Sequence, residues 1–323
     1  MNICFVSEGN EKIGMGHVMR CLSLAEAFKK RAHNVFFFST GELGREKIIA
    51  HGFELVSSIK EEWDCIVADT YDITSSFFEN LKTYTRCLVY IDDLNQFTYP
   101  VDILVNGTAS AEYMGYAEKQ SAELLLGLKY NLLREEFQNI CCTDQKHDNE
   151  SIKITTGNSD PKHMTEKILR ILLAEDYTKK LEYHVVVGSG FASKTSIGNE
   201  FAENRNVHFH IEPAKMSDIM SVSDFAVTAG GGTLYELAAC GVPAAVFSYA
   251  DNQNPQIEAL CQMNAIFYFG KAENIDGKIL VDTIRNMGTQ HLKRNEHVKR
   301  LKHLVDGKGT ERIVEEIEIY ILK

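Results

Sequence analysis

Short apolar runs alternate with helically periodic segments along the chain, and this alternation constrains the fold more than any other feature. The first such unit has apolar runs at 3–7 and 34–38 around a helical segment at 17–30. One stripe of this helical segment is apolar, formed by Val18, Cys21, Leu22, Ala25 and Phe28. A strand, a helix and a second strand in this order predict a βαβ unit with parallel strands.

The same pattern recurs through both halves of the chain. Further strands are predicted at 65–68, 88–91, 152–155, 184–187, 224–228 and 244–247. The chain has 323 residues, more than one hydrophobic core usually serves. We therefore predict an α/β protein with two doubly wound parallel sheets in two Rossmann-like domains.

The domain boundaries follow from a polar segment without hydrophobic period, at 139–150. The predicted domains are 1–143 and 151–308, followed by a helix at 309–323 that could dock back on the first domain. We expect Thr310 to cap this helix. Its apolar stripe is Ile313, Val314, Ile317 and Ile321.

Composition and charge exclude several classes of protein. The formal net charge of −11 argues against nucleic-acid binding, which needs a dense basic face. No apolar stretch approaches the roughly 20 residues that span a bilayer, and the first residues form a strand-like run without the features of a signal peptide. Several of the eight cysteines lie in apolar runs, which indicates reduced thiols. We expect a soluble cytoplasmic protein; its oligomeric state cannot be read from the sequence.

Metal and cofactor chemistry have no signature in the sequence. There is no Asp-x-Asp motif and no His/Cys cluster at metal-ligand spacing, so we expect neither a metal nor a cofactor. The turn Gly14-Met15-Gly16-His17 between the first strand and helix lacks the third glycine of a dinucleotide fingerprint. NAD binding is therefore not expected.

His17 opens the first predicted helix, where the positive end of the helix dipole favours a neutral imidazole that can accept a proton. The glycines before it allow a ligand to approach the backbone closely. The residue is either a general base or a histidine that caps or packs the helix, and its spacing alone does not decide between the two.

A second glycine-rich turn, 228–236, follows a strand in the second half and precedes a helix. The amides of Gly231, Gly232 and Thr233 are placed to bind a diphosphate. No Walker lysine follows. Glu236, one turn into the helix, could accept the hydroxyls of a ribose or could simply be a glutamate favoured by the helix dipole.

Carboxylates also follow two strands of the first domain. Asp69 ends one strand, and Asp92 and Asp93 end the next. Ligand sites of α/β sheets lie at these strand ends, although aspartates also cap loops there.

Taken together, the segments 13–20, 69–71, 91–93, 102–106 and 133–137 resemble the nucleotide-sugar hydrolases of pseudaminic acid biosynthesis, the PseG type, which are relatives of the MurG glycosyltransferases. The glycine-rich turn with Glu236 and the later Asn252-Gln253-Asn254 resemble that family's UDP-binding elements. The resemblance covers nearly all of the first domain and implies the GT-B fold, in which two domains face a cleft.

The resemblance implies hydrolysis of a UDP-linked 2,4-diacetamido-2,4,6-trideoxy hexose to UDP and the free sugar, by inverting attack of water at the anomeric carbon. The implied catalytic residues are His17, as the base, and Tyr71. The implied site residues are Gly14, Gly16, Arg20, Asp69, Asp93 and Asn252 on the substrate side and Gly230, Gly231, Gly232, Thr233, Glu236 and Gln253 on the UDP side.

Two segments depart from the family pattern. Thr70 stands where the family often has histidine, and Thr156-Gly157-Asn158-Ser159-Asp160 stands where it has two glycines before a Ser/Thr-Asp pair. The second departure bears on the identity of the sugar or on contacts between the domains. Two other functions fit the same residues: an inverting UDP-sugar glycosyltransferase, in which His17 activates an acceptor hydroxyl, and a non-catalytic nucleotide-sugar binding protein.

Overall fold

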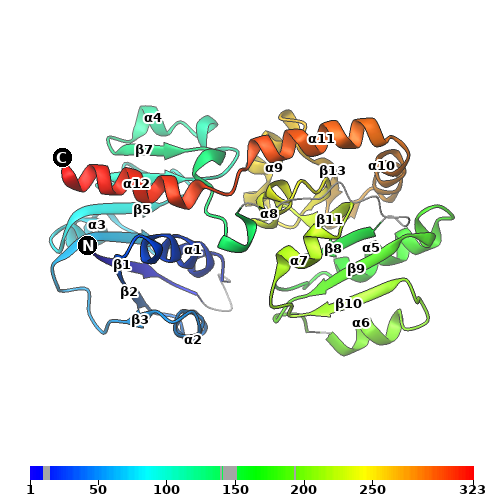
Figure 1. Ribbon diagram of the computed structural model, residues 1–323, viewed down its shortest axis with the longest axis horizontal. Helices are drawn as coiled ribbons and strands as arrows, with labels where there is room; N and C mark the ends of the chain where they lie inside the picture. The colour runs from blue at the N-terminus through cyan, green and yellow to red at the C-terminus, as the bar shows by residue number, and fades with distance from the viewer. Residues whose placement is uncertain (10–14, 139, 141–150, 193) are drawn as a thin grey trace. The chain divides into compact units, whose positions relative to one another are not determined.

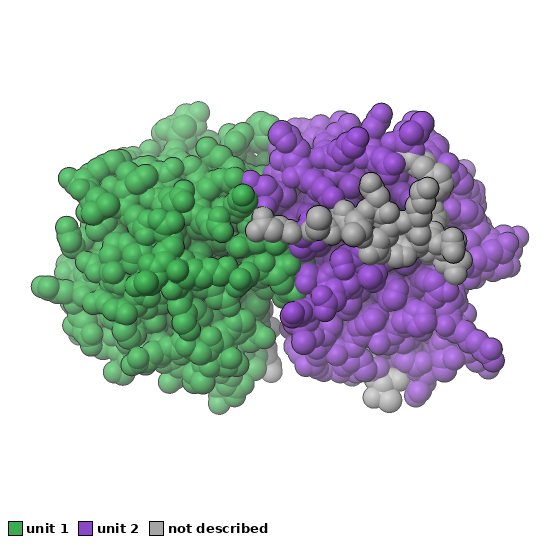
Figure 2. Space-filling model, viewed as in Figure 1, with its two compact units in different colours: residues 1–138, 307–323 green, residues 139–306 purple. Residues whose placement is uncertain are grey.

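The computed structural model describes residues 1–9, 15–138, 140, 151–192 and 194–323. The chain forms two compact units (Figures 1 and 2). Unit 1 comprises residues 1–138 and 307–323, and unit 2 comprises residues 139–306. Most of the polar segment 139–150 and Gly14 lie outside the described residues.

Unit 1 is built on a parallel sheet of seven strands in the order β3-β2-β1-β4-β5-β6-β7. The strands are β1 (Asn2–Ser7), β2 (Asn34–Ser39), β3 (Glu54–Leu55), β4 (Trp63–Asp69), β5 (Thr85–Ile91), β6 (Ile103–Asn106) and β7 (Glu123–Leu126). The helices are α1 (Gly16–Lys30), α2 (Glu42–Ala50), α3 (Ser75–Lys82), α4 (Tyr116–Lys119) and α12 (Gly309–Leu322).

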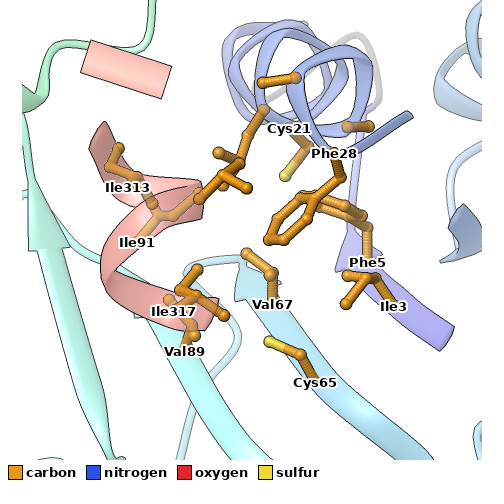
Figure 3. Close-up of a cluster of buried hydrophobic side chains, with 14 of the residues drawn as sticks. Ile3, Phe5, Cys21, Phe28, Cys65, Val67, Val89, Ile91, Ile313 and Ile317 are labelled. Carbon is orange, nitrogen blue, oxygen red and sulfur yellow. The ribbon is translucent and has the colours of Figure 1, made fainter. Parts of the chain in front are cut away.

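The core of unit 1 joins the two ends of the chain. The predicted stripe of α1 is buried, with Cys21 and Phe28 fully inaccessible. Ile313 and Ile317 of α12 lie in the same cluster, against the strands of the sheet (Figure 3). Helix α12 thus completes the core that the N-terminal βαβ unit begins.

Unit 2 repeats the architecture, with the strand order β10-β9-β8-β11-β12-β13-β14, in which only β14 is antiparallel to its neighbour. The strands are β8 (Ser151–Thr155), β9 (Glu182–Val187), β10 (Val207–Ile211), β11 (Phe225–Ala229), β12 (Ala244–Ser248), β13 (Phe267–Lys271) and β14 (Asn274–Ile275). The helices are α5 (Met164–Ala174), α6 (Lys194–Glu200), α7 (Met216–Ser221), α8 (Thr233–Ala239), α9 (Asn254–Gln262), α10 (Gly277–Thr289) and α11 (His291–Leu304).

Each sheet reverses its winding at one place, and the predicted functional turns lie there. In unit 1 the reversal falls between β1 and β4. The connection after β1 leads to His17, and β4 ends in Asp69. In unit 2 it falls between β8 and β11, and the glycine-rich turn follows β11. Open α/β sheets bind ligands at such switch points, beyond the carboxyl ends of the strands.

The α/β fold with two parallel-sheet, Rossmann-like units confirms the predicted fold class. One local prediction was wrong: helix α12 begins at Gly309, and its N-cap is Lys308 without a side-chain hydrogen bond. Thr310 therefore lies inside the helix, where its hydroxyl accepts a hydrogen bond from the Gln138 amide at 3.4 Å. Several strands were not predicted, mostly short or edge strands: β3, β6, β7, β10, β13 and β14.

Candidate active site

His17 is the second residue of α1 and is almost fully buried. Met15 occupies the N-cap position without a side-chain hydrogen bond, so the helix end is not closed by a capping side chain. A Cβ atom added to Gly16 would meet nothing within 4 Å. The glycine therefore leaves open space beside His17, as expected where a ligand approaches the backbone.

Asp69, at the end of β4, ties His17 to the neighbouring arginine. Its Oδ1 lies 2.6 Å from His17 Nδ1 and accepts a hydrogen bond of 2.6 Å from an Nη of Arg20. Its Oδ2 accepts one of 2.5 Å from Arg20 Nε. Arg20 also donates to Asp93 Oδ2 at 3.1 Å, which in turn accepts the Tyr71 hydroxyl at 3.0 Å. The Tyr71 ring stands edge-on to the His17 ring, 4.4 Å away at 89°. The fold thus joins His17, Arg20, Asp69, Tyr71 and Asp93 into one network.

Burial and charge have opposite effects on the pKa values of Asp69 and Arg20, and charge has the larger effect on both. Burial alone would raise the pKa of Asp69, but the Arg20 guanidinium and the bond from His17 hold it below its usual range. Burial would lower the pKa of Arg20, but Asp69 and Asp93 raise it. Burial and the Asp93 carboxylate raise the pKa of Tyr71. At neutral pH the network therefore holds an ionised Asp69, a charged Arg20 and a neutral Tyr71.

The adjacent aspartates 92 and 93 have different surroundings. Asp92 is buried and accepts the Tyr99 hydroxyl at 3.2 Å, the Tyr116 hydroxyl at 2.6 Å and the backbone amides of residues 94 and 95. It therefore organises the loop after β5. Asp93 alone faces Arg20 and Tyr71. The sequence could not tell these two carboxylates apart.

Thr70, at the first departure from the family pattern, is also nearly buried. Its hydroxyl donates to Glu8 Oε1 at 2.8 Å and accepts the amide of Asp72 at 3.1 Å. Thr70 therefore connects the ends of β1 and β4. The imidazole that bonds Asp69 belongs to His17.

The three glycines of the unit 2 turn have different roles. A Cβ atom on Gly230 would lie 2.4 Å from Ile257 Cδ1, so Gly230 is required for packing against α9. At Gly231 and Gly232 an added Cβ would meet nothing within 4 Å. The Gly231 amide, which was predicted to bind a diphosphate, instead donates to the Ala229 carbonyl at 2.8 Å. Among the described residues, the amides of Gly232 and Thr233 make no hydrogen bond, and both remain available to a ligand.

The other predicted UDP-side residues lie around this turn. Glu236 is half-buried in the first turn of α8. Asn252 is exposed in the short 3₁₀ turn 251–253. The side-chain oxygen of Gln253 accepts the backbone amide of Tyr249 at 2.8 Å, so this residue also shapes the loop after β12.

Asp160, in the second departure from the family pattern, caps α5 through the amides of Met164 and Thr165, at 2.8 and 2.7 Å. The Tyr249 hydroxyl donates to the same carboxylate. No local pattern in the sequence indicates this link, because the two residues are 89 positions apart.

Within the described part of the chain, no group of three His, Cys, Asp or Glu side chains is placed to hold a metal ion. No helix in that part is long and apolar enough to cross a membrane.

The two units and their switch-point turns define a GT-B-type fold, and solved structures agree. MurG of Acinetobacter baumannii superposes with a TM-score of 0.70 over 98% of this chain and 99% of its own, at 11% identity. No profile of a known protein family matches the sequence.

Curated relatives confirm the resemblance that the motifs predicted. The spore coat polysaccharide biosynthesis protein SpsG of Bacillus subtilis is 24% identical over 97% of this chain and 96% of its own. The UDP-2,4-diacetamido-2,4,6-trideoxy-β-L-altropyranose hydrolase of Campylobacter jejuni is 22% identical over 78% of this chain and 93% of its own. An uncharacterized protein of Methanocaldococcus jannaschii is 27% identical over 76% of this chain, and the match spans 55% of that longer protein.

Proposed function

We propose that the protein hydrolyses a UDP-linked 2,4-diacetamido-2,4,6-trideoxy hexose to UDP and the free sugar, with water attacking and inverting the anomeric carbon. The observation that carries this proposal is the 2.6 Å hydrogen bond between His17 and Asp69 at the switch point of unit 1. The free amides of the unit 2 turn and the activity named for the C. jejuni relative support it.

The His17–Asp69 bond selects the tautomer of the imidazole. An ionised carboxylate can only accept hydrogen bonds, so Nδ1 carries the proton and donates it to Asp69. The other nitrogen, Nε2, then has a free lone pair and can act as a base. Among the described residues, Nε2 makes no hydrogen bond. Arg20 bonds both oxygens of Asp69, one of them beside His17 Nδ1, which keeps the carboxylate ionised and fixed.

In the proposed step, His17 Nε2 takes one proton from a water molecule as the water oxygen bonds to the anomeric carbon. The bond between that carbon and the phosphate oxygen breaks, and its electron pair leaves with UDP. A glycosidase needs a carboxylic acid to protonate its leaving oxygen. A diphosphate needs none once its charge is stabilised, and we assign that stabilisation to the amides of Gly232 and Thr233.

For three of the predicted site residues, the contacts in the structure support a more specific role than the sequence did. Asp69 is inaccessible, so we assign it to positioning His17 and not to contact with the sugar. Arg20 positions Asp69 and Asp93. Tyr71 is 40% exposed and is the member of the network most open to a substrate.

Hydrolysis of the UDP-2,4-diacetamido sugar in ¹⁸O-labelled water tests the reaction. The label should appear on the anomeric oxygen of the sugar, with the inverted anomer formed first. Label in UDP would show attack at phosphorus and would contradict the proposal. Turnover that begins only when a sugar or lipid acceptor is added would instead establish the glycosyltransferase, and UDP binding without turnover of either kind would establish the binding protein.

A further inference from the structure

Unit 2 contains a hollow that none of the predicted site residues line. It opens at the carboxyl ends of β12 and β13, has a volume of about 600 Å³ and is bounded by residues 248–251, 268, 270–271 and 273–274. This volume lies in the range of small-molecule sites. The segment after β12 lines the hollow with residues 248–251 and lies next to the glycine-rich turn. Gly230 of that turn donates its amide to the Phe247 carbonyl and packs against Gln253.

An irregularity in the sheet forms one wall of the hollow. Val246 pairs with Tyr268, but Ser248 pairs with Lys271, so β13 carries one extra residue at this point. Side chains alternate between the faces of a regular strand, and one extra residue reverses the alternation. Tyr268 and Lys271, three positions apart, therefore both line the hollow. Gly270 makes the irregularity possible, with a φ of +121° that other residues rarely adopt.

Two tyrosines are held in place around the hollow. The Tyr268 hydroxyl lies 3.0 Å from Ser248 Oγ, and 36% of Tyr268 is exposed. Tyr249 is fixed by its bond to the Asp160 carboxylate, and the Lys162 ammonium lies 5.3 Å from the centre of its ring. Rings held in this way form preorganised apolar surfaces that lose little entropy on binding.

The charges around the hollow are paired. Lys271 lies 3.1 Å from Asp251 Oδ1, and Glu273 is bonded to Lys162. Lys162 neutralises Glu273 and Lys271 neutralises Asp251, so these four side chains together carry no net charge. A phosphate would meet no unpaired positive charge in this lining, whereas a neutral ligand with hydrogen-bonding groups needs none. Asn274 in the lining offers both a donor and an acceptor.

We propose that this hollow holds the acetamido-substituted part of the sugar. An acetamido group combines a methyl, which suits the tyrosine rings, with an N–H and a C=O, which suit Asn274 and the Asp251–Lys271 pair. This inference rests on the proposed function and adds to it a recognition site that selects an N-acetylated hexose. The family resemblance assigns the nucleoside to Glu236, and Glu236 does not line the hollow.

Binding measurements with two variants test the inference. Tyr268→Ala removes one wall, and Ala250→Trp fills the hollow from an exposed position. Each is made in the His17→Ala protein, so that the UDP-2,4-diacetamido sugar is not consumed during calorimetry. We expect each variant to weaken binding of this sugar nucleotide about tenfold, the order of one lost aromatic contact, and to leave the Kd of UDP within about twofold. Tyr113→Ala, at a 69% exposed tyrosine of unit 1, is the matched control and should change neither.

The outcomes separate this inference from the proposed function. Unchanged affinity for the sugar nucleotide in both variants would overturn the inference while leaving the hydrolase proposal intact. Equal weakening of UDP and the sugar nucleotide would place the nucleoside in the hollow and would also overturn it. A wild-type protein that binds UDP but does not hydrolyse the sugar nucleotide would contradict the proposed function, whatever the variants do.

Discussion

Replacing Asp69 with asparagine should abolish most of the activity while leaving the substrate bound. Asp69 is inaccessible and accepts three short hydrogen bonds, one from His17 and two from Arg20. With its oxygen in the Oδ2 position, the introduced amide keeps the bond from Arg20 Nε, and its NH₂ group then takes the Oδ1 position, where it faces His17 Nδ1 and an Arg20 Nη. This NH₂ donates where the carboxylate accepted, so the proton of the imidazole moves to Nε2 and the base is lost.

The magnitude follows from the two consequences of the change. The wrong tautomer of a His–Asp pair costs about 10⁴-fold in kcat, and KM should change little because Asp69 does not reach the substrate. Arg20 keeps its bond to Asp93 but loses the buried counter-charge. We expect the free energy of unfolding to fall by about 3 kcal/mol, the lower end of the cost of breaking a buried pair.

Three measurements check this prediction: steady-state release of UDP, urea unfolding, and ¹⁵N chemical shifts of the His17 ring, which report the tautomer. Asp92→Asn is the matched control, because Asp92 is equally buried and hydrogen-bonded but contacts the loop after β5 and not His17. It should lose stability and retain the kcat of the folded fraction. An Asp69→Asn protein with kcat within tenfold of wild type would refute the reasoning.

Three further outcomes are expected. Gly230→Ala should lower the free energy of unfolding by about 1–3 kcal/mol, because its Cβ would overlap a side chain of α9. Gly231→Ala, which meets open space, should leave stability within about 0.5 kcal/mol; equal urea midpoints for the two variants would contradict this. Burial, and then repulsion from His210 and His208, lowers the pKa of His184, which lies 3.0 Å from His210. Burial also lowers the pKa of His210. At low pH the unfolded chain therefore binds protons that the folded chain does not bind. The free energy of unfolding should fall as the pH drops below 6.5, the ordinary pKa of histidine. His184→Gln should flatten this dependence in thermal melts from pH 8 to 5, and an unchanged slope would exclude His184 as its source. Ile317→Ala should cost about 2–5 kcal/mol, since this side chain of α12 is fully buried in the core of unit 1; a loss below 1 kcal/mol would show that α12 contributes little.

The periodicity of the sequence was sufficient to predict the long elements. The central strands β1, β4 and β11 are largely apolar because they are covered on both faces, and α1 has an apolar stripe because it is packed on one face. In β8, Ile152 and Ile154 alternate with polar residues. Strands of two to four residues such as β3 and β6 are too short to show a period, and β10 is a largely exposed edge strand whose polar residues conceal it.

The candidate site was also predicted from the sequence only in part. The sequence by itself determined which turns could bind a ligand, since glycines before a helix and carboxylates at strand ends are local signals. Only the tertiary structure decided that Asp69, 52 residues away, accepts from His17, that Asp93 and not Asp92 joins Arg20, and that Gly230 serves packing while Gly232 leaves a free amide. The physical reason is that a hydrogen bond or a steric contact depends on positions in space. Parallel strands bring distant residues to one edge of a sheet, and no local pattern in the sequence records which of them meet.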